Sequence, residues 1–160
     1  MCRVRSELRV SLLEDADEAA WDAFVLAQPQ ATFFHRAGWR RVIRQTYGHG
    51  TPFLLARDGG GIRGVLPLVH VRSRLFGDAL VSTGFCVQGG ILAADATAAT
   101  ALAAAAEAMG RERRVAYVEL RGDGEEELPG WRVKEGIYAG FRQALPADEA
   151  ENLKAIPRKK

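Results

Sequence analysis

Three β-type runs follow one another between Pro52 and Leu92, with no helical pattern between them. The first two, PFLLAR and IRGVLPLVHVRS, are joined by Asp58-Gly59-Gly60-Gly61, a glycine-rich hairpin signal. A turn around Phe76-Gly77-Asp78 leads to the third run, ALVSTGFCVQGGIL. Short turns join antiparallel neighbours, so this region predicts an antiparallel meander. It argues against a doubly wound nucleotide-binding fold, in which strands and helices alternate one by one.

A proline and several glycines interrupt these runs. Pro67 cannot donate a ladder hydrogen bond, so it predicts a sheet edge or a bulge within the second run. Gly84 could mark a bulge in the third run, which Gly89 and Gly90 close. The two closing glycines either punctuate the end of a strand or allow backbone amides to approach a bound group.

The remaining segments complete an α/β order. ELRVSLLE reads as a first strand, DADEAAWDAFVLAQ as a helix ended by Pro29, and residues from His35 to Tyr47 as a second helix. After the meander comes an alanine-rich helix, capped by Asp95 or Thr97 and ending near Gly110. VAYVELRG and IYAGFRQAL then read as strands on either side of an acidic loop. This is the order of the GNAT acyltransferase fold, an α/β domain with a mixed central sheet flanked by helices.

Composition limits the function classes. The 160 residues suit about one domain, and 22 basic against 20 acidic residues argue against DNA binding. Cys2 and Cys86 lie far apart, which favours reduced thiols and a cytoplasmic location. Two cysteines and three histidines have no metal-ligand spacing, so we expect no metal site. The alanine-rich segment is too polar to span a membrane, which leaves only peripheral membrane association open.

Several ordered segments resemble the FemAB-like acyltransferases. They are ATFFHRAGWRRVIRQTYGH, GVLPLVHVRSRLFG, LVSTGFCVQGG, VAYVELRG and the closing NLKAIPRKK. More narrowly, they resemble the FemAB-type proteins found with exosortase (PEP-CTERM) and exopolysaccharide systems in Gram-negative bacteria. The resemblance begins at about Thr32 and covers nearly the whole chain from there. It implies tandem GNAT-like domains, with the IPRK helix passing from the first to the second.

The resemblance divides the chain. We expect residues 1–146 to form an N-terminal GNAT-like domain and residues 147–160 to begin a helix that leads to a second GNAT-like domain beyond this sequence. Asp148 is the expected N-cap of that helix, and Leu153 and Ile156 share its apolar face. The alternative is a single-domain protein with a basic tail.

The implied activity is transfer of an acyl or aminoacyl group to an amine on a small-molecule, glycan or peptide acceptor, in cell-envelope, peptidoglycan-type or exopolysaccharide synthesis. An ordinary GNAT domain holds the coenzyme A pyrophosphate in an Arg/Gln-x-x-Gly-x-Gly/Ala loop, from which VQGGILAAD departs. We therefore expect no cofactor on this half, poor activity of the half alone, and an aminoacyl-tRNA or acyl-CoA donor for the longer protein. The alternative is a non-catalytic GNAT-like module that recognises an acceptor or a partner protein.

The candidate site residues come from three segments. Arg36, Arg40 and Arg44 recur at i,i+4 spacing, either as a solvated helix side or as a clamp for phosphate or carboxylate. Glu119 and Arg121 form either an ion pair at a sheet surface or a base for the amine with an anion-binding partner. The catalytic residue is otherwise unknown. The expected substrate-binding residues are Arg36, Trp39, Arg40, Phe85, Gln88, Gly89, Gly90, Tyr117 and Arg121.

The other reactive side chains have simpler interpretations. Cys86 is expected to be inert core rather than a nucleophile. His70 is expected to be half-buried and hydrogen-bonded, and His35 and His49 to be terminal or capping groups of the second helix. The decisive feature is the cleft between residues 81–88 and 115–121. An open, polar cleft favours a transferase, whereas one filled by Phe85 and Tyr117 favours a degenerate module.

Overall fold

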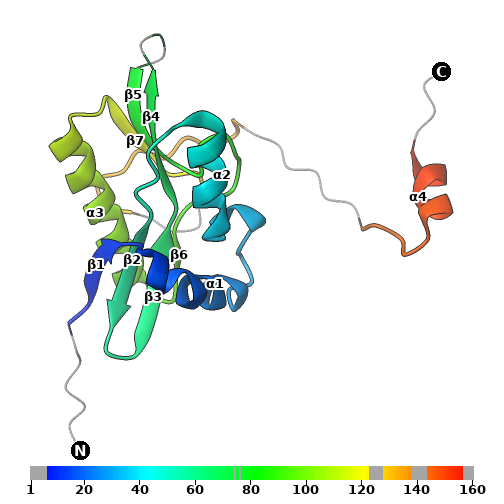
Figure 1. Cartoon of the computed structure of the whole chain (residues 1–160), viewed down its shortest axis with the longest axis horizontal. Helices are drawn as coiled ribbons and strands as arrows, with labels where there is room; N and C mark the ends of the chain where they lie inside the picture. Colours follow the sequence, from blue (N-terminus) through cyan, green and yellow to red (C-terminus); the bar gives the residue numbers. More distant parts are fainter. Residues whose placement is uncertain (1–6, 74, 76, 123–127, 138–143, 157–160) are drawn as a thin grey trace, which may run out of the picture.

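The computed structural model describes residues 7–73, 75, 77–122, 128–137 and 144–156. Within them, strands form two sheets with helices on both sides (Figure 1). The strands are β1 (Arg9–Leu12), β2 (Leu54–Asp58), β3 (Gly61–Leu66), β4 (Leu68–Ser73), β5 (Gly77–Ser82), β6 (Leu92–Ala93) and β7 (Tyr117–Glu119). The α-helices are α1 (Glu18–Leu26), α2 (Gly38–Tyr47), α3 (Ala96–Arg113) and α4 (Glu149–Ala155), and short 3-10 turns cover Asp15–Asp17 and Phe33–His35.

The strand order confirms the predicted α/β class with mixed pairing. One sheet has the order β1-β2-β3-β6, and all its neighbours are antiparallel. The other has the order β4-β5-β7, in which β4 and β5 are antiparallel but β5 and β7 are parallel. The predicted meander is therefore present, and α3 provides the crossover that makes the last pair parallel.

Pro67 separates the two sheets. The run predicted as one strand divides there into β3 and β4, which pair with different neighbours. Pro67 has no N–H for the ladder, but its carbonyl accepts a hydrogen bond from the N–H of Thr83 over 2.8 Å. The predicted interruption is confirmed, although it is a break between two strands rather than an edge or a bulge within one. Likewise β5 ends at Ser82, so Gly84 lies in a turn and not in a bulge.

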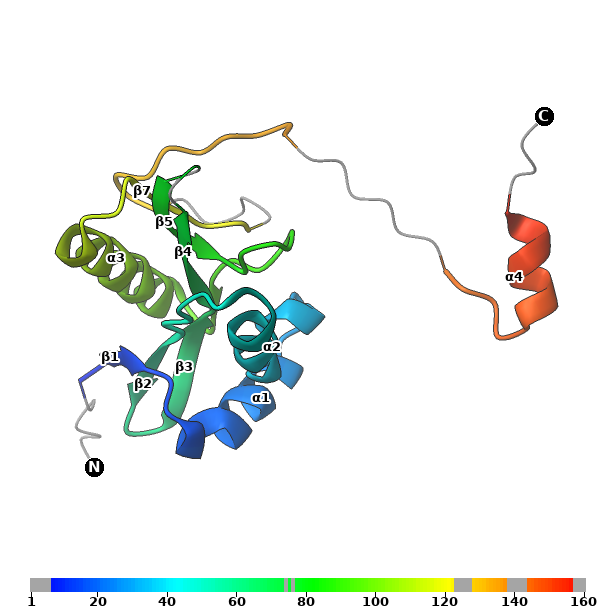
Figure 2. The same ribbon diagram turned by 45° about the horizontal axis from the view of Figure 1, so that its top comes forward.

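Alternate residues of β2 face two separate cores, as the period of two requires. Leu55, and Phe53 just before the strand, pack with Trp21 of α1, whereas Leu54 and Ala56 pack with Leu102 of α3. Figures 1 and 2 show α3 on one side of the strands and α1 with α2 on the other. Buried alanines of α3, among them Ala98 and Ala106, let the helix lie close to the sheet.

Both ends of α3 can be explained from its residues. Asp95 is the N-cap, as expected, and its carboxylate accepts from the N–H of Ala98 over 2.9 Å. The predicted end near Gly110 is wrong: the helix runs to Arg113, and Arg114 caps it with φ 56°. Gly110 is instead a packing residue, because an added Cβ would lie 2.5 Å from Cγ2 of Val118 in β7.

The predicted second helix is shorter than expected. A 3-10 turn at Phe33–His35 precedes α2, which begins at Gly38 and ends at Gly48 with φ 69°. Toward the other end of the chain, most of the predicted strand IYAGFRQAL lies outside the described residues. The side chain of Asp148 caps α4 as predicted, by accepting from the N–H of Ala150 over 2.7 Å. None of the described helices is long and apolar enough to cross a membrane.

Candidate functional site

The carboxyl ends of the parallel strands β5 and β7 lie side by side. The pairs Ala79↔Tyr117, Leu80↔Val118 and Val81↔Glu119 bring them together. Ligands of α/β sheets often bind beyond the carboxyl ends of parallel strands. The cleft predicted from the sequence would open here, between the residues after Ser82 and those after Glu119.

Arg121 joins the segments that follow β5 and β7 through four hydrogen bonds. Its N–H donates to Oγ of Ser82 over 2.7 Å, and its carbonyl accepts from the N–H of Gly89 over 2.8 Å. Its guanidinium donates to the carbonyl of Cys86 over 2.8 Å and to Oε1 of Glu119 over 2.6 Å. The predicted Glu119–Arg121 ion pair is confirmed. The segments beyond the two strands are therefore held together rather than splayed.

The closed end of the β5–β7 pair is neither the open, polar cleft nor the cleft filled by Phe85 and Tyr117 that the sequence predicts. An open, polar-lined cleft would need the segments to separate. A filled one would bury Phe85 and Tyr117, but these side chains are 51% and 52% exposed. Arg121 closes the space instead. The sequence does not predict this contact, because Arg121 lies far along the chain from the glycine-rich loop.

Gly89 and Gly90 are required by the packing of the 83–90 loop. A Cβ on Gly89 would overlap the side chain of Thr83, and one on Gly90 would lie 2.9 Å from Cα of Gly122. The N–H of Gly89 is already bonded to Arg121. Internal packing thus accounts for both glycines without a bound group.

The same loop contains most of the unusual backbone geometry of the described chain. Thr83, Phe85 and Gln88 have φ values of 44°, 70° and 61°. Arg114 is the remaining described non-glycine residue with positive φ. Thr83 is fully buried, and its Oγ1 has no hydrogen-bond partner among the described atoms. Such strain concentrates at functional sites, where surrounding contacts hold it.

His35 contacts the 83–90 loop from the turn before α2, whereas Arg121 contacts it from the segment after β7. Its Nδ1 accepts from the N–H of Thr32 over 3.0 Å, which leaves the proton on Nε2, 3.3 Å from the carbonyl of Gly90. Oγ1 of Thr32 donates to the carbonyl of Gln88 over 2.9 Å. The predicted capping role of His35 is confirmed, and the buried ring also links the turn before α2 to the loop. His49 instead stacks on Phe85.

Arg36, which lies just before α2, contacts α1. Arg36 donates to Asp22 over 2.8 Å, and the other oxygen of Asp22 accepts from the N–H of Ala37. Burial alone would raise the pKa of Asp22, but the hydrogen bonds from Arg36 and Ala37 outweigh it and lower the pKa.

Arg40 is only 7% exposed, so the solvated-side interpretation is wrong for it. It donates to the carbonyl of Leu13 over 2.6 Å and pairs with Asp15 and Glu18. Arg44 is exposed, as that interpretation expected. An anion bound by Arg36 or Arg40 would have to displace these internal carboxylates.

Cys86 and His70 also contact groups inside the protein. Burial raises the pKa of the Cys86 thiol, and the smaller opposing effects of Trp39 and Arg121 do not reverse this. Cys86 therefore stays a protonated, buried thiol, consistent with an inert role. His70 is half-buried, 2.5 Å from Asp78 and 3.2 Å from Arg113, which confirms a satisfied histidine. The described residues contain no group of histidine, cysteine, aspartate and glutamate suited to a metal ion.

Solved structures share this arrangement of elements. A transcriptional regulator from Bacillus halodurans C-125 superposes with a TM-score of 0.56 and 11% identity, over 87% of this chain and 100% of its own. An aminoglycoside 6'-N-acetyltransferase from Acinetobacter baumannii gives 0.52 and 14%, over 88% and 100%. A GNAT family acetyltransferase from Staphylococcus aureus gives 0.50 and 13%, over 86% and 98%.

The chain has a GNAT-like fold. The fold predicted from the order of elements is thereby confirmed. No protein-family model matches the sequence, and no curated protein matches it. The comparisons thus support the GNAT-like fold and not the finer FemAB-like or exosortase-associated resemblance.

The start of α3 does not suit the pyrophosphate of an acyl-CoA in this GNAT-like domain. A helix N-terminus attracts phosphate through its free N–H groups. Here the carboxylate of Asp95 accepts from Ala98 and from Arg63, the latter over 2.6 Å, and these bonds lower the pKa of Asp95. The start of α3 already carries the negative charge of Asp95, and the nearby guanidinium of Arg63 is paired with that carboxylate. We therefore assign no step to an acyl-CoA bound at this helix.

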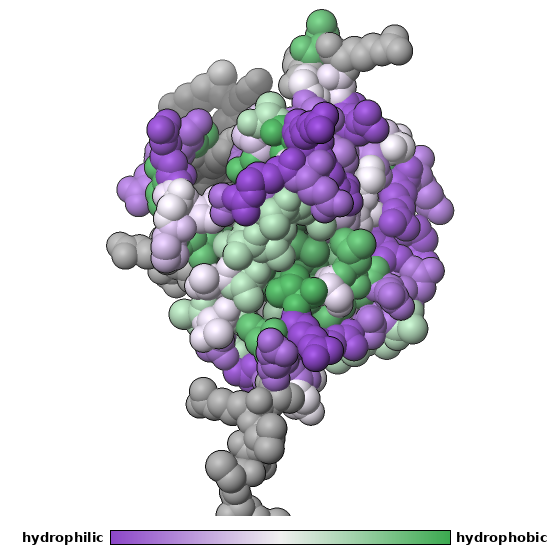
Figure 3. Space-filling model, turned by 90° about the vertical axis from the view of Figure 1, so that its left-hand side faces the viewer, coloured by the Kyte–Doolittle hydropathy of each residue, from purple (hydrophilic) through white to green (hydrophobic). Residues whose placement is uncertain are grey.

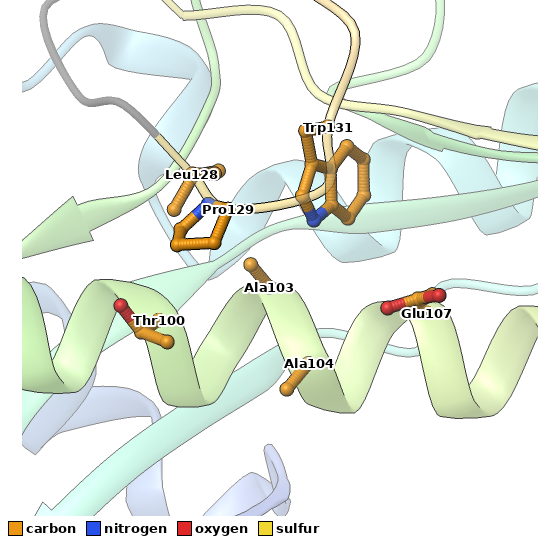
Figure 4. A pocket seen from close by; sticks show the side chains of 7 residues that line it. All are labelled: Thr100, Ala103, Ala104, Glu107, Leu128, Pro129 and Trp131. Atoms are coloured by element: carbon orange, nitrogen blue, oxygen red, sulfur yellow. The ribbon is translucent and has the colours of Figure 1, made fainter.

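A small cavity lies elsewhere, on the outer side of α3. Pro129 and Trp131 stand over the helix between Thr100 and Glu107 (Figure 4). Its volume is about 70 Å³, whereas ligand pockets usually measure about 300–1,000 Å³. The cavity is too small for an acyl donor.

Proposed function

We propose that this chain is the acceptor-side GNAT-like domain of a FemAB-like N-acyltransferase of the cell envelope or of exopolysaccharide synthesis. The observation that carries the proposal is the pairing of Asp95 with Arg63 at the start of α3. It disfavours donor binding at the helix that would otherwise receive a pyrophosphate. A GNAT-like domain without a donor position can still contribute by seating the acceptor.

The reaction moves an acyl group from a thioester or ester to an amine. The amine nitrogen attacks the carbonyl carbon, the bond to the donor sulfur or oxygen breaks, and the amine proton passes to a base. Glu119 is the candidate base, but its carboxylate is held by Arg121. In the proposal, Arg121 must release Glu119 before that carboxylate can take the proton.

Exposed apolar surface supports a second domain that packs against this one. Figure 3 shows hydrophobic residues across the middle of one face, surrounded by hydrophilic ones. Leu8, Val10, Ala105 and Met109 are partly buried residues of the core between β1 and α3. Leu153 of α4 and Ile156, the C-cap residue of that helix, are 63% and 62% exposed. We propose residues 1–146 as the first domain and 147–160 as the start of the connection.

A non-catalytic binding module is the second candidate. It is favoured by the four hydrogen bonds of Arg121, which close the end of the β5–β7 pair.

Calorimetry and a transfer assay separate the candidates. We expect the 160-residue chain to show no binding of acetyl-CoA, and the product extended by the downstream coding sequence to acylate amines. Transfer by the short chain alone would overturn the acceptor-side proposal. If neither product transfers an acyl group from acetyl-CoA or an aminoacyl-tRNA, the binding module becomes the better account.

A further inference from the structure

In the turn at Thr83–Cys86, glycine is not at the position where the backbone is left-handed. The N–H of Cys86 donates to the carbonyl of Thr83 over 2.9 Å, so Gly84 and Phe85 are the central residues. Phe85 has φ 70°, whereas Gly84 is not left-handed. A turn with positive φ at its third residue favours glycine or asparagine there. Phenylalanine therefore occupies the strained position although a glycine stands directly before it.

The strain is not offset by burial of the Phe85 side chain. Its ring is 51% exposed and stacks on Tyr47, which is itself 50% exposed, with centroids 4.3 Å apart and planes at 12°. His49 lies nearly parallel to the same ring, at 5.5 Å and 7°. A strained backbone and an exposed aromatic ring are both unfavourable to the isolated domain. Together they indicate a surface kept for a ligand.

The surrounding contacts hold this aromatic group in place. Arg121 donates to the carbonyl of Cys86, and Thr32 donates to the carbonyl of Gln88, so both sides of the loop are anchored. Figure 2 shows the loop after β5 beside α2, which provides Tyr47 at its last residue. The stack is therefore preorganised, which reduces the entropy lost when a ligand binds.

We infer that Phe85, Tyr47 and His49 form a platform for a sugar ring of the acceptor. A pyranose has an apolar face of C–H groups and an edge of hydroxyls. Phe85 and Tyr47 remain 51% and 50% exposed although their rings are stacked, so apolar ring surface stays open to such a ligand. The tyrosine hydroxyl and the histidine nitrogens add polar groups to the same cluster. The inference rests on the proposed acceptor-side function and names the chemical class of that acceptor.

The size of the platform favours a ring ligand over a protein. Large aromatic side chains present about 150–250 Å² each, so two half-exposed rings offer about 200 Å² together. A stable protein interface buries about 800 Å² per partner. The platform covers one or two sugar rings but only a fraction of such an interface.

The charges nearby favour a sugar over a nucleic acid. Single-stranded nucleic acids need a track of positive groups along their phosphates. Arg36, Arg40 and Arg121 are paired with carboxylates of this chain. Arg44 is exposed one turn before Tyr47, and one guanidinium suits a sugar with a single carboxylate per ring.

Saturation-transfer NMR on the 160-residue chain tests the inference, with digalacturonic acid as the acidic probe and triacetylchitotriose as the neutral one. We expect transfer from the aromatic protons of Tyr47 and Phe85 to sugar C–H groups. Phe85→Ala and Tyr47→Ala should each weaken binding by about tenfold, which corresponds to the loss of about 1.4 kcal/mol. Arg44→Gln should weaken only the acidic probe. Leu26→Ala, at a 69% exposed apolar residue of α1, is the matched control and should change nothing.

The outcomes are distinguishable. No transfer from these rings to either sugar at millimolar concentration overturns the inference, as does stronger binding of AMP at the same protons. The measurement on the unmodified chain needs no variant, so a variant that fails to fold does not affect it. Sugar binding without acyl transfer by the extended protein would retain the platform and reject the transferase. Acyl transfer by the extended protein without sugar binding to this chain would reject the platform and retain the transferase.

Discussion

The backbone N–H of Arg121 donates to Oγ of Ser82, 39 residues earlier in the sequence, over 2.7 Å across the ends of two parallel strands. This bond, with the guanidinium contacts of the same residue to Glu119 and Cys86, keeps the 83–90 loop against β7. In a GNAT-like sheet, the gap between these strands is where we expected a substrate cleft. The closed end therefore makes Arg121 the residue whose removal should most directly expose the loop.

Replacing Arg121 by alanine should loosen the loop without unfolding the domain. The variant loses two charge-assisted hydrogen bonds to partly buried acceptors, for an expected loss of about 1–3 kcal/mol in the free energy of unfolding. The backbone bonds to Ser82 and Gly89 remain. Hydrogen exchange should accelerate at residues 83–90, and urea unfolding gives the stability.

Arg111→Ala is the control for that experiment. Arg111 forms an exposed i,i+4 pair with Glu107, and such pairs contribute about 0.5 kcal/mol or less. Equal losses in the two variants, or unchanged exchange in the loop, would show that the Arg121 guanidinium does not hold the loop closed.

Asp22→Asn should change how stability depends on pH. The folded-state pKa of Asp22 lies below its ordinary value of 3.8, so ionised Asp22 stabilises the fold at pH values above 3.8. That stabilisation is lost as the pH falls through the lowered folded-state pKa. At pH 7 the variant should be less stable by about 1–2 kcal/mol, because an amide replaces a carboxylate that accepts from Arg36 and Ala37.

The difference in unfolding free energy between Asp22→Asn and the parent should therefore shrink in acid. Urea titrations at pH 7 and at about pH 3 measure it. A constant difference across that range would contradict the assigned contacts. Glu107→Gln is a suitable control, since Glu107 is more than half exposed and should contribute little at either pH.

Local signals in the sequence predict the elements well but do not predict the closed site. The DGGG hairpin, the break at Pro67 and the caps at Asp95 and Asp148 depend on neighbouring residues, so they can be read locally. The stack of Tyr47 on Phe85 joins residues from a helix end and a distant turn, and it depends on how α2 packs. The burial of Arg40 is not predictable from its own helix for the same reason, because its partners come from the segment before α1 and from α1 itself.

Gly89→Ala should strongly destabilise the chain. Its Cβ would overlap the Thr83 side chain, which is fully buried and cannot move outward. Overpacking of this severity costs about 3 kcal/mol or more, so poor expression or a large fall in Tm is expected. Gly38→Ala is the matched control: nothing lies within 4 Å of its added Cβ, and alanine at the start of α2 should be neutral or stabilise by up to about 1 kcal/mol. Similar effects of the two substitutions on Tm would reject the close contact of Gly89 with Thr83.

Gly110→Ala sets helix propensity against packing. Within α3, alanine should be better than glycine by about 1 kcal/mol, because it restricts the unfolded chain and forms helix more readily. The added Cβ, however, would lie 2.5 Å from Cγ2 of Val118, the central residue of β7. We expect packing to dominate, with a net loss of about 1–3 kcal/mol in the free energy of unfolding.

Val118→Ala removes the obstructing methyl groups, so the double variant Gly110→Ala/Val118→Ala should be more stable than the sum of the single effects predicts. Thermal and urea unfolding of the four proteins give the coupling energy. If Gly110→Ala stabilises the chain, or if the effects of the two substitutions simply add, then α3 does not approach β7 this closely. In that case the contact between Gly110 and Val118 does not position Glu119, the next residue of the strand.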